Sequence, residues 1–202
     1  MAALGPTPHV DLSDPNAAAQ LAARERIDFT IVGPELPLSL GVVDRFVNEG
    51  RLVFGPSRAA ARLESSKAFA KAFMARHQVP TARFHTCQSA AEALTVVRSG
   101  TFGFPVVVKA DGLAAGKGVI IAEDRAAAET AISALMNDRK FGAAGDCIVI
   151  EECLSGPEVS FFVLSDGERA RALASAQDHK RLLDDDKHQQ ALECRRPCTD
   201  GL

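Results

Sequence analysis

The sequence predicts a mixed α/β protein built from two successive lobes. In the first, an apolar stretch (27–32), a helical stretch (40–48) and a second apolar stretch (52–54) follow one another closely, an order typical of parallel strands. In the second, residues 106–108 and 118–121 are rich in β-branched side chains and enclose a glycine-rich segment, which predicts a hairpin. Helices and strands therefore alternate along most of the chain.

Composition excludes several classes of protein. The 202 residues carry a net charge of -3 with both signs interspersed and contain neither Trp nor Tyr, so nothing favours a nucleic-acid or membrane-surface partner. The five cysteines form an odd set without a C-x-x-C motif, which argues against a disulfide framework or a zinc cluster. The absence of a signal peptide and of a long apolar run predicts a cytoplasmic protein.

Turn and capping signals divide the first part of the chain. Residues 1–14 are irregular, and a helix over 15–26 follows, with Asp14 as N-cap and Pro15 in its first turn. Gly33 and Pro34 end the strand over 27–32, just beyond its carboxyl end, where open α/β sheets bind ligands. A simple backbone corner explains this turn equally well.

The remaining helices and strands follow from the same signals. Ser57 is predicted to cap a short helix, Ser65 a helix that runs to residue 77, Ser89 a helix over 90–98 and Asp124 a helix over 125–138. Further strands are predicted over 84–87, 148–154, 158–164 and 169–175, and residues 177–181 read as a polar loop.

The hairpin around residue 112 is the candidate site. Gly112, Gly116 and Gly118 would let backbone N–H groups approach an anion, and Lys109 and Lys117 bracket the loop, which suits a polyphosphate. The spacing fits neither the P-loop nor the dinucleotide-binding pattern, since the loop joins two strands instead of opening a helix. A flexible surface hairpin with solvated lysines is the alternative interpretation.

These residues resemble the ATP-grasp enzymes, and within them the glycinamide ribonucleotide synthetase (phosphoribosylamine-glycine ligase) family. The resemblance rests on residues 108–120, 141–145, 148–152 and 177–181, with 31–35, 54–56 and 63–67 upstream, and covers about 27–185. It implies a partial pre-ATP-grasp (Rossmann-like) lobe followed by the first, incomplete part of an ATP-grasp domain. The implied division is 1–57 for the substrate-binding lobe, which would lack its first strand, 58–78 for connecting helices, 79–186 for the nucleotide-binding lobe and 187–202 for an unrelated, disordered tail.

The resemblance also implies a reaction and its small-molecule partners. ATP would drive the joining of glycine to 5-phosphoribosylamine, giving glycinamide ribonucleotide, ADP and phosphate in purine biosynthesis. The implied ATP-binding residues are Lys67, Lys109, Gly112, Gly116, Lys117, Gly118, Glu151, Glu152, Cys153, Leu154 and Glu158. The implied substrate-binding residues are Gly33, Pro34, Glu35, Asp178, Lys180 and Arg181. No catalytic acid, base or nucleophile is implied.

Two details of this assignment can be argued from the residues themselves. Glu151 and Glu152 are neighbours in a strand and must face opposite sides, so only one can meet the adenine, and a paired acid and base is disfavoured. The resemblance, and not the residues alone, implies that the backbone of Cys153 and Leu154 meets the adenine ring edge and that Glu158 binds the ribose, and a surface glutamate at the start of a strand is the alternative for Glu158. Lys67 would lie in the first turn of a helix, where it opposes the dipole, which favours an anion nearby, and a solvated lysine is the alternative.

The family pattern stops after residue 184. The resemblance implies that the family's magnesium (or manganese) ligands lie in a later lobe, so no metal ligand is predicted in this chain, and nucleotide binding without turnover is expected. The alternatives are another ATP-grasp carboxylate-amine ligase and a non-catalytic nucleotide-binding fragment.

Overall fold

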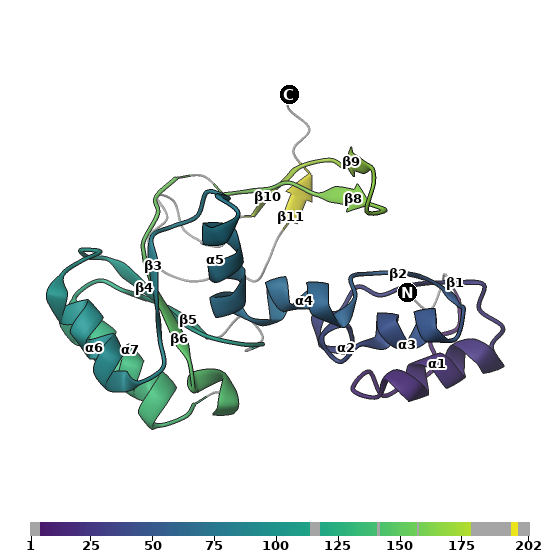
Figure 1. The fold of residues 1–202 in the computed structure, drawn as a ribbon, viewed down its shortest axis with the longest axis horizontal. Helices are drawn as coiled ribbons and strands as arrows, with labels where there is room; N and C mark the ends of the chain where they lie inside the picture. Colours follow the sequence, from purple (N-terminus) through teal and green to yellow (C-terminus); the bar gives the residue numbers. More distant parts are fainter. Residues whose placement is uncertain (1–4, 114–117, 141, 157, 179–194, 198–202) are drawn as a thin grey trace. The chain divides into compact units, whose positions relative to one another are not determined.

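The computed structural model describes residues 5–113, 118–140, 142–156, 158–178 and 195–197 (Figure 1). The chain divides into two compact units, Met1–Cys153 and Leu154–Leu202. Helices and strands alternate through the first unit, which confirms the predicted mixed α/β fold. None of the helices in the described part of the chain is long and apolar enough to cross a membrane.

The first part of unit Met1–Cys153 is a two-stranded parallel sheet with helices. Its elements are α1 (Pro15–Arg24), β1 (Phe29–Ile31), α2 (Glu35–Ser39), α3 (Val42–Asn48), β2 (Leu52–Phe54) and α4 (Arg58–Ser65). The strands pair in parallel with Phe29 opposite Leu52, as predicted. The helix predicted over 40–48 is wrong at its start, because Gly41 adopts φ +87° and separates α2 from α3.

A small core lies between these helices and the sheet. Small and β-branched side chains of α1 and α3 pack around Phe46, which is 2% exposed. Along each strand the outer residues point away from this core, and Ile31 and Leu52 are both 69% exposed. One face of the parallel sheet is therefore half-buried, and the other exposes apolar side chains to solvent.

The second part of this unit is a four-stranded antiparallel sheet with its own helices. Its elements are α5 (Lys67–Arg76), β3 (Phe84–Cys87), α6 (Ala90–Ser99), β4 (Val106–Ala110), β5 (Val119–Ala122), α7 (Arg125–Ile132), the π-helical turn η1 (Ser133–Asn137), the 3-10 turn η2 (Gly142–Gly145) and β6 (Ile148–Glu152). The strand order is β3-β6-β4-β5, and α6 and α7 lie side by side (Figure 1).

The two faces of this sheet differ in chemistry. Val106, Val108, Ile148 and Ile150 belong to one apolar core with residues of α6 and α7. Side chains alternate along a strand, so the residues between them face the other way. That second face carries Lys109 and Glu151 as well as apolar side chains, and the α5 helix contacts it through Lys71.

The segment from α7 to β6 is held by close backbone packing. The helix predicted over 125–138 keeps Asp124 as its N-cap but changes to a π-helical turn after Ile132. A Cβ on Gly145 would lie 2.0 Å from the carbonyl oxygen of Leu135, a distance that no side chain tolerates. The predicted turn over 141–145 is therefore confirmed for its described residues, and packing against η1 explains its last glycine.

In the described residues of unit Leu154–Leu202, the regular elements are short strands. They are β7 (Val159–Ser160), β8 (Val163–Ser165), β9 (Ala170–Ala172), β10 (Ala176–Asp178) and β11 (Arg195–Pro197), in the orders β11-β10-β7 and β8-β9. The continuous strand predicted over 158–164 is wrong, since β7 and β8 belong to different sheets. Residues 177 and 178, the start of the loop predicted over 177–181, belong to the paired strand β10. Most of the predicted tail, 187–202, lies outside the described residues.

Candidate nucleotide-binding site

The glycine-rich loop joins two antiparallel strands, as the sequence predicts. Lys109 of β4 lies opposite Val119 of β5, and the backbone N–H of Ala110 donates to the carbonyl of Gly118 at 2.8 Å. Gly112 adopts φ +95°, a left-handed conformation that favours glycine. The predicted phosphate-binding residues Gly116 and Lys117 lie outside the described residues.

A buried cluster of charges lies on the sheet face beside this loop. Glu151 of β6 is 2% exposed, and its two carboxylate oxygens form ion pairs with the ammonium groups of Lys71 and Lys109, one each. Lys71 also donates to the Thr81 hydroxyl at 2.8 Å and to the Ala82 carbonyl at 3.4 Å. Two ammonium groups therefore compensate one buried carboxylate.

The two lysines of this cluster differ in their exposure to solvent. The Lys71 side chain is 10% exposed and that of Lys109 is 29% exposed. A carboxylate buried this deeply needs a compensating cation, because removing a charge from water costs several kcal/mol, about the same order as the attraction of a close pair. Lys71 is the more deeply buried of the two cations paired with Glu151, so we call it the permanent partner. Lys109 is the more exposed cation, which a ligand could reach.

Lys71 is the residue that sequence reasoning missed. Helix α5 does not bury its aromatic residues: Phe69 and Phe73 are only half-buried, and the guanidinium of Arg62 lies 4.0 Å from the centre of the Phe69 ring. Lys71 is the buried residue of the helix. The sequence did contain one signal for Lys71: it follows Lys67 by four positions and therefore lies near the same side of the helix.

Glu152 points to the other side of β6, which confirms the prediction that Glu151 and Glu152 face opposite ways. It accepts from the Arg83 backbone N–H at 2.9 Å and from the Arg83 side chain at 2.6 Å. These hydrogen bonds hold the pKa of Glu152 below its ordinary value of 4.5. Contact of either glutamate with adenine stays a prediction.

The start of the glycine-rich loop is fastened to the N-terminus of α5. The Asp111 carboxylate accepts from the Ala68 backbone N–H at 3.0 Å and from the Ser66 hydroxyl at 3.1 Å. Lys67 donates to the carbonyl of Gly112 at 2.9 Å. The Asp111 carboxylate thus lies at the N-terminus of α5, where a negative charge is favourable.

The N-cap of α5 is Ser66 rather than Ser65, which corrects the sequence prediction. The Ser66 hydroxyl accepts from the Phe69 backbone N–H at 3.1 Å. Both serines can cap a helix, and Asp111, distant in sequence, hydrogen-bonds to Ser66.

Comparison with known proteins identifies the family to which this architecture belongs. The model of the phosphoribosylglycinamide synthetase ATP-grasp (A) domain matches residues 65–193, and that of the N domain matches 1–64. The chain belongs to the phosphoribosylglycinamide synthetase family. The join between the two matched domains falls within the predicted connecting segment, 58–78.

Relatives in the phosphoribosylglycinamide synthetase family are about 50% identical to this chain over the part that aligns. The phosphoribosylamine-glycine ligase of Ralstonia nicotianae is 53% identical over 178 residues, which are 88% of this chain and 42% of the relative. That of Haemophilus influenzae is 48% identical over 178 residues, 88% of this chain and 41% of the relative. The chain therefore spans about two fifths of the length of these relatives.

Solved structures agree with the ATP-grasp architecture of the family. The crystal structure of phosphoribosylamine-glycine ligase from Thermotoga maritima has a TM-score of 0.71 and 31% identity, over 92% of this chain and 43% of that chain. Carboxyaminoimidazole ribonucleotide synthase from Aspergillus clavatus, complexed with ATP, has a TM-score of 0.66 at 17% identity, over 89% and 45% of the two chains. The second likeness shows the fold alone.

The family's implied substrate loop lies where the sequence predicts it. Gly33 and Pro34 follow the carboxyl end of β1, and Glu35 begins helix α2. Nothing lies within 4 Å of a Cβ built on Gly33, so no close packing requires a glycine there. Binding of the amine substrate by this loop stays a prediction.

The remaining implied residues are divided between the two units. Cys153 ends the first unit, while Leu154 and Glu158 belong to the second and are exposed within it. Asp178 is the last residue of β10, and Lys180 and Arg181 lie outside the described residues. Their predicted contacts with adenine, ribose and substrate phosphate stay predictions.

Proposed function

We propose that this chain binds ATP on the sheet face that carries Lys109 and Glu151. We further propose that it serves the reaction of its family, in which glycine is joined to 5-phosphoribosylamine in purine biosynthesis. The observation that carries the proposal is the buried cluster of Lys71, Glu151 and Lys109 beside the glycine-rich hairpin. The bound ATP of the Aspergillus clavatus fold neighbour is consistent with it.

The cluster supplies a cation that can change partners. When a triphosphate approaches, Lys109 would turn from Glu151 towards a phosphate oxygen, and Lys71 would keep the buried carboxylate compensated. A charge pair about 4 Å apart is worth about 1 kcal/mol in water and about 4 kcal/mol at an effective dielectric constant of about 20. A lysine at the edge of a buried cluster therefore attracts phosphate more strongly than a solvated one.

The loop would provide the remaining contacts with the phosphates through backbone N–H groups. Its first residues are fixed because Asp111 and Gly112 are both bonded to the start of α5. Fixing one end of a glycine-rich loop lowers the entropy lost when the loop closes on a ligand. The chain's own contribution is thus binding and orientation of ATP.

The proposed chemistry has two steps that conserve all atoms. The glycine carboxylate attacks the terminal phosphorus of ATP, which breaks the bond to ADP and forms glycyl phosphate. The amine of 5-phosphoribosylamine then attacks the glycyl carbonyl, phosphate leaves, and the amine loses a proton as the amide forms. Both steps depend on alignment and charge neutralisation, so no nucleophilic residue of the protein is required.

The described residues next to the hairpin do not fit a magnesium site. Magnesium prefers carboxylate and other oxygen ligands, but Asp111 is bonded to the start of α5 and Glu151 is paired with two lysines. These residues therefore include no magnesium ligand. The magnesium or manganese requirement and the cytoplasmic location both stay predictions.

The decisive experiment measures ATP binding and ADP formation by the purified chain. We expect Lys109→Met to weaken ATP binding at least about ten-fold, since a hydrogen bond to a charged group contributes about 1.5–3 kcal/mol. Arg98→Met is the matched control, because Arg98 lies on α6, over the opposite face, and pairs with Glu129. Equal ATP affinity in the wild type and Lys109→Met would contradict the proposal.

The ADP assay separates the proposed reaction from its rivals. Phosphoribosylamine-glycine ligase activity requires ADP release that depends on both glycine and 5-phosphoribosylamine. ADP release driven by another small carboxylic acid, and not by glycine, would indicate a different ATP-grasp ligase. ATP binding without any ADP release would indicate a nucleotide-binding role for this chain by itself.

A further inference from the structure

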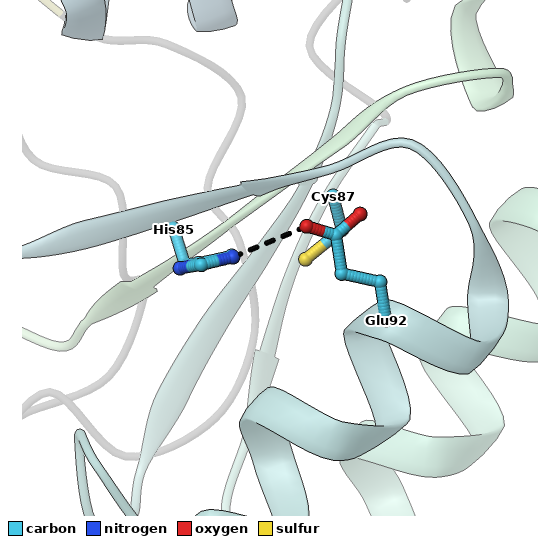
Figure 2. A group of neighbouring side chains, drawn as sticks. All are labelled: His85, Cys87 and Glu92. Carbon is cyan, nitrogen blue, oxygen red and sulfur yellow. Dashed lines mark hydrogen bonds and ion pairs between the residues drawn. The ribbon is translucent and has the colours of Figure 1, made fainter.

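A second group of side chains lies away from the hairpin face, at the edge strand β3. His85 and Cys87 project from β3 and Glu92 from the first turn of α6, and the three converge (Figure 2). One ligand-type atom from each lies within 4.8 Å of the other two. In the described part of the chain, these three form the group of histidine, cysteine and acidic residues that could hold a metal ion.

We propose that His85, Cys87 and Glu92 bind one zinc-like divalent cation and so connect β3 to α6. A nitrogen, a sulfur and a carboxylate oxygen are the ligands that zinc takes in proteins, whereas magnesium and calcium avoid thiolates. Three protein ligands leave a fourth tetrahedral position for water. The proposal does not depend on nucleotide binding, because the site faces the apolar core under α6.

Local structure brings the three ligands together. His85 and Cys87 are two residues apart in a strand, so they project from the same face, opposite Ile150 and Ile148 in the register. Glu92 is the third residue of α6, whose N-cap is Ser89. One Glu92 oxygen accepts from the Gln88 backbone N–H at 2.8 Å, which fixes the carboxylate. The ligands therefore come from a rigid strand-turn-helix segment.

The distances are close to those of a tetrahedral site. Metal bonds of about 2.0–2.1 Å to nitrogen and oxygen place two such ligands about 3.3 Å apart. The His85 ring nitrogen and the second Glu92 oxygen are already 3.2 Å apart. Cys87 needs only to approach these two atoms for its sulfur to complete the triangle.

The position of each ligand suits entry of a cation from solvent. The side chains of His85 and Glu92 are 49% and 41% exposed and form the mouth, while Cys87 is 0% exposed and forms the floor. Hydrogen bonds hold His85 and Glu92 in place at this mouth, and the Cys87 sulfur lies beneath them at the edge of the apolar core. Burial raises the pKa of the Cys87 thiol to about 12, so binding would release its proton.

Cobalt is the probe for this site, because thiolate ligation to Co²⁺ gives a charge-transfer absorption that other ligands do not. We expect the reduced wild-type chain to bind one Co²⁺ with this absorption, and Zn²⁺ to abolish it by displacement. His85→Gln should weaken the affinity at least about ten-fold. Cys153→Ser and the double variant Cys194→Ser/Cys198→Ser should bind as the wild type does.

Cys87→Ser is the most direct variant, but it changes a buried position, so His85→Gln and Glu92→Gln carry the test if it does not fold. Zn²⁺ should also raise the thermal midpoint of the wild type and not that of His85→Gln. The proposal is overturned if His85→Gln binds Co²⁺ like the wild type. It is equally overturned if the thiolate absorption disappears in Cys194→Ser/Cys198→Ser.

Discussion

The two sheets of unit Met1–Cys153 differ in how deeply they bury their side chains. In the parallel pair, Ile31 and Leu52 are exposed and one face has no buried residue. In the antiparallel sheet, Val108, Ile148 and Ile150 are completely buried, and the opposite face also encloses Glu151. A carboxylate can be buried only where cations and packed side chains surround it, so the charge cluster requires the second sheet.

The largest expected effect comes from removing the permanent partner of Glu151. Lys71→Met should lower the free energy of unfolding by about 3 kcal/mol, because it leaves a buried carboxylate with a single cation. Urea denaturation measures the change. The double variant Lys71→Met/Glu151→Leu should be more stable than Lys71→Met alone, and a further loss of stability in the double variant would refute the role of Lys71.

A second large effect is expected where the chain packs against η1. Gly145→Ala should lower the free energy of unfolding by about 1–3 kcal/mol, since its Cβ would overlap the Leu135 carbonyl oxygen. Gly33→Ala in the first region is the matched control, with open space around the added methyl group, and should stay within about 0.5 kcal/mol of the wild type. If Gly145→Ala and Gly33→Ala lowered the free energy of unfolding equally, close packing at Gly145 would not be the cause.

A smaller, pH-dependent effect is expected at Glu152, the half-buried acid next to Glu151 in β6. Hydrogen bonds from Arg83 lower the pKa of Glu152 below 4.5, so the ionised form stabilises the fold above about pH 4.5. This contribution is lost as pH falls below 4.5 through the depressed pKa. Glu152→Gln should therefore be less stable than the wild type near pH 7, and the denaturation midpoints should converge in acid. A difference that grows in acid would have the wrong sign.

The smallest effect is expected on the exposed face of the parallel sheet. Ile31→Thr keeps a β-branched side chain and removes apolar surface that is already 69% exposed, so stability should change by less than about 0.5 kcal/mol. Urea denaturation alongside Lys71→Met tests the comparison between the sheets directly. A loss as large as that of Lys71→Met would mean that this face is buried in solution.

Sequence reasoning succeeded where structure is determined by neighbours along the chain. Ser57, Ser89 and Asp124 cap the helices they were expected to cap, and alternation along β6 places Glu151 and Glu152 on opposite faces. The hairpin strands pair as predicted because glycine and β-branched residues specify them locally.

Sequence reasoning failed where distant residues determine the outcome. The burial of Lys71 depends on Glu151, eighty positions later in the chain, and Ser66 binds Asp111 across 45 positions. The need for glycine at position 145 arises from the nearby Leu135 carbonyl. From the sequence alone, this glycine looks like an ordinary turn residue. Local propensity contains no information about such contacts.

The preference of the chain for ATP over adenosine tests the central claim most directly. If Lys109 beside the glycine-rich hairpin holds the phosphates, isothermal titration calorimetry should show that the wild type binds ATP more tightly than adenosine. In Lys109→Met, the ratio of ATP affinity to adenosine affinity should fall at least about ten-fold, while the affinity for adenosine should change little. Equal binding of ATP and adenosine by the wild type, or an unchanged preference in Lys109→Met, would contradict the account.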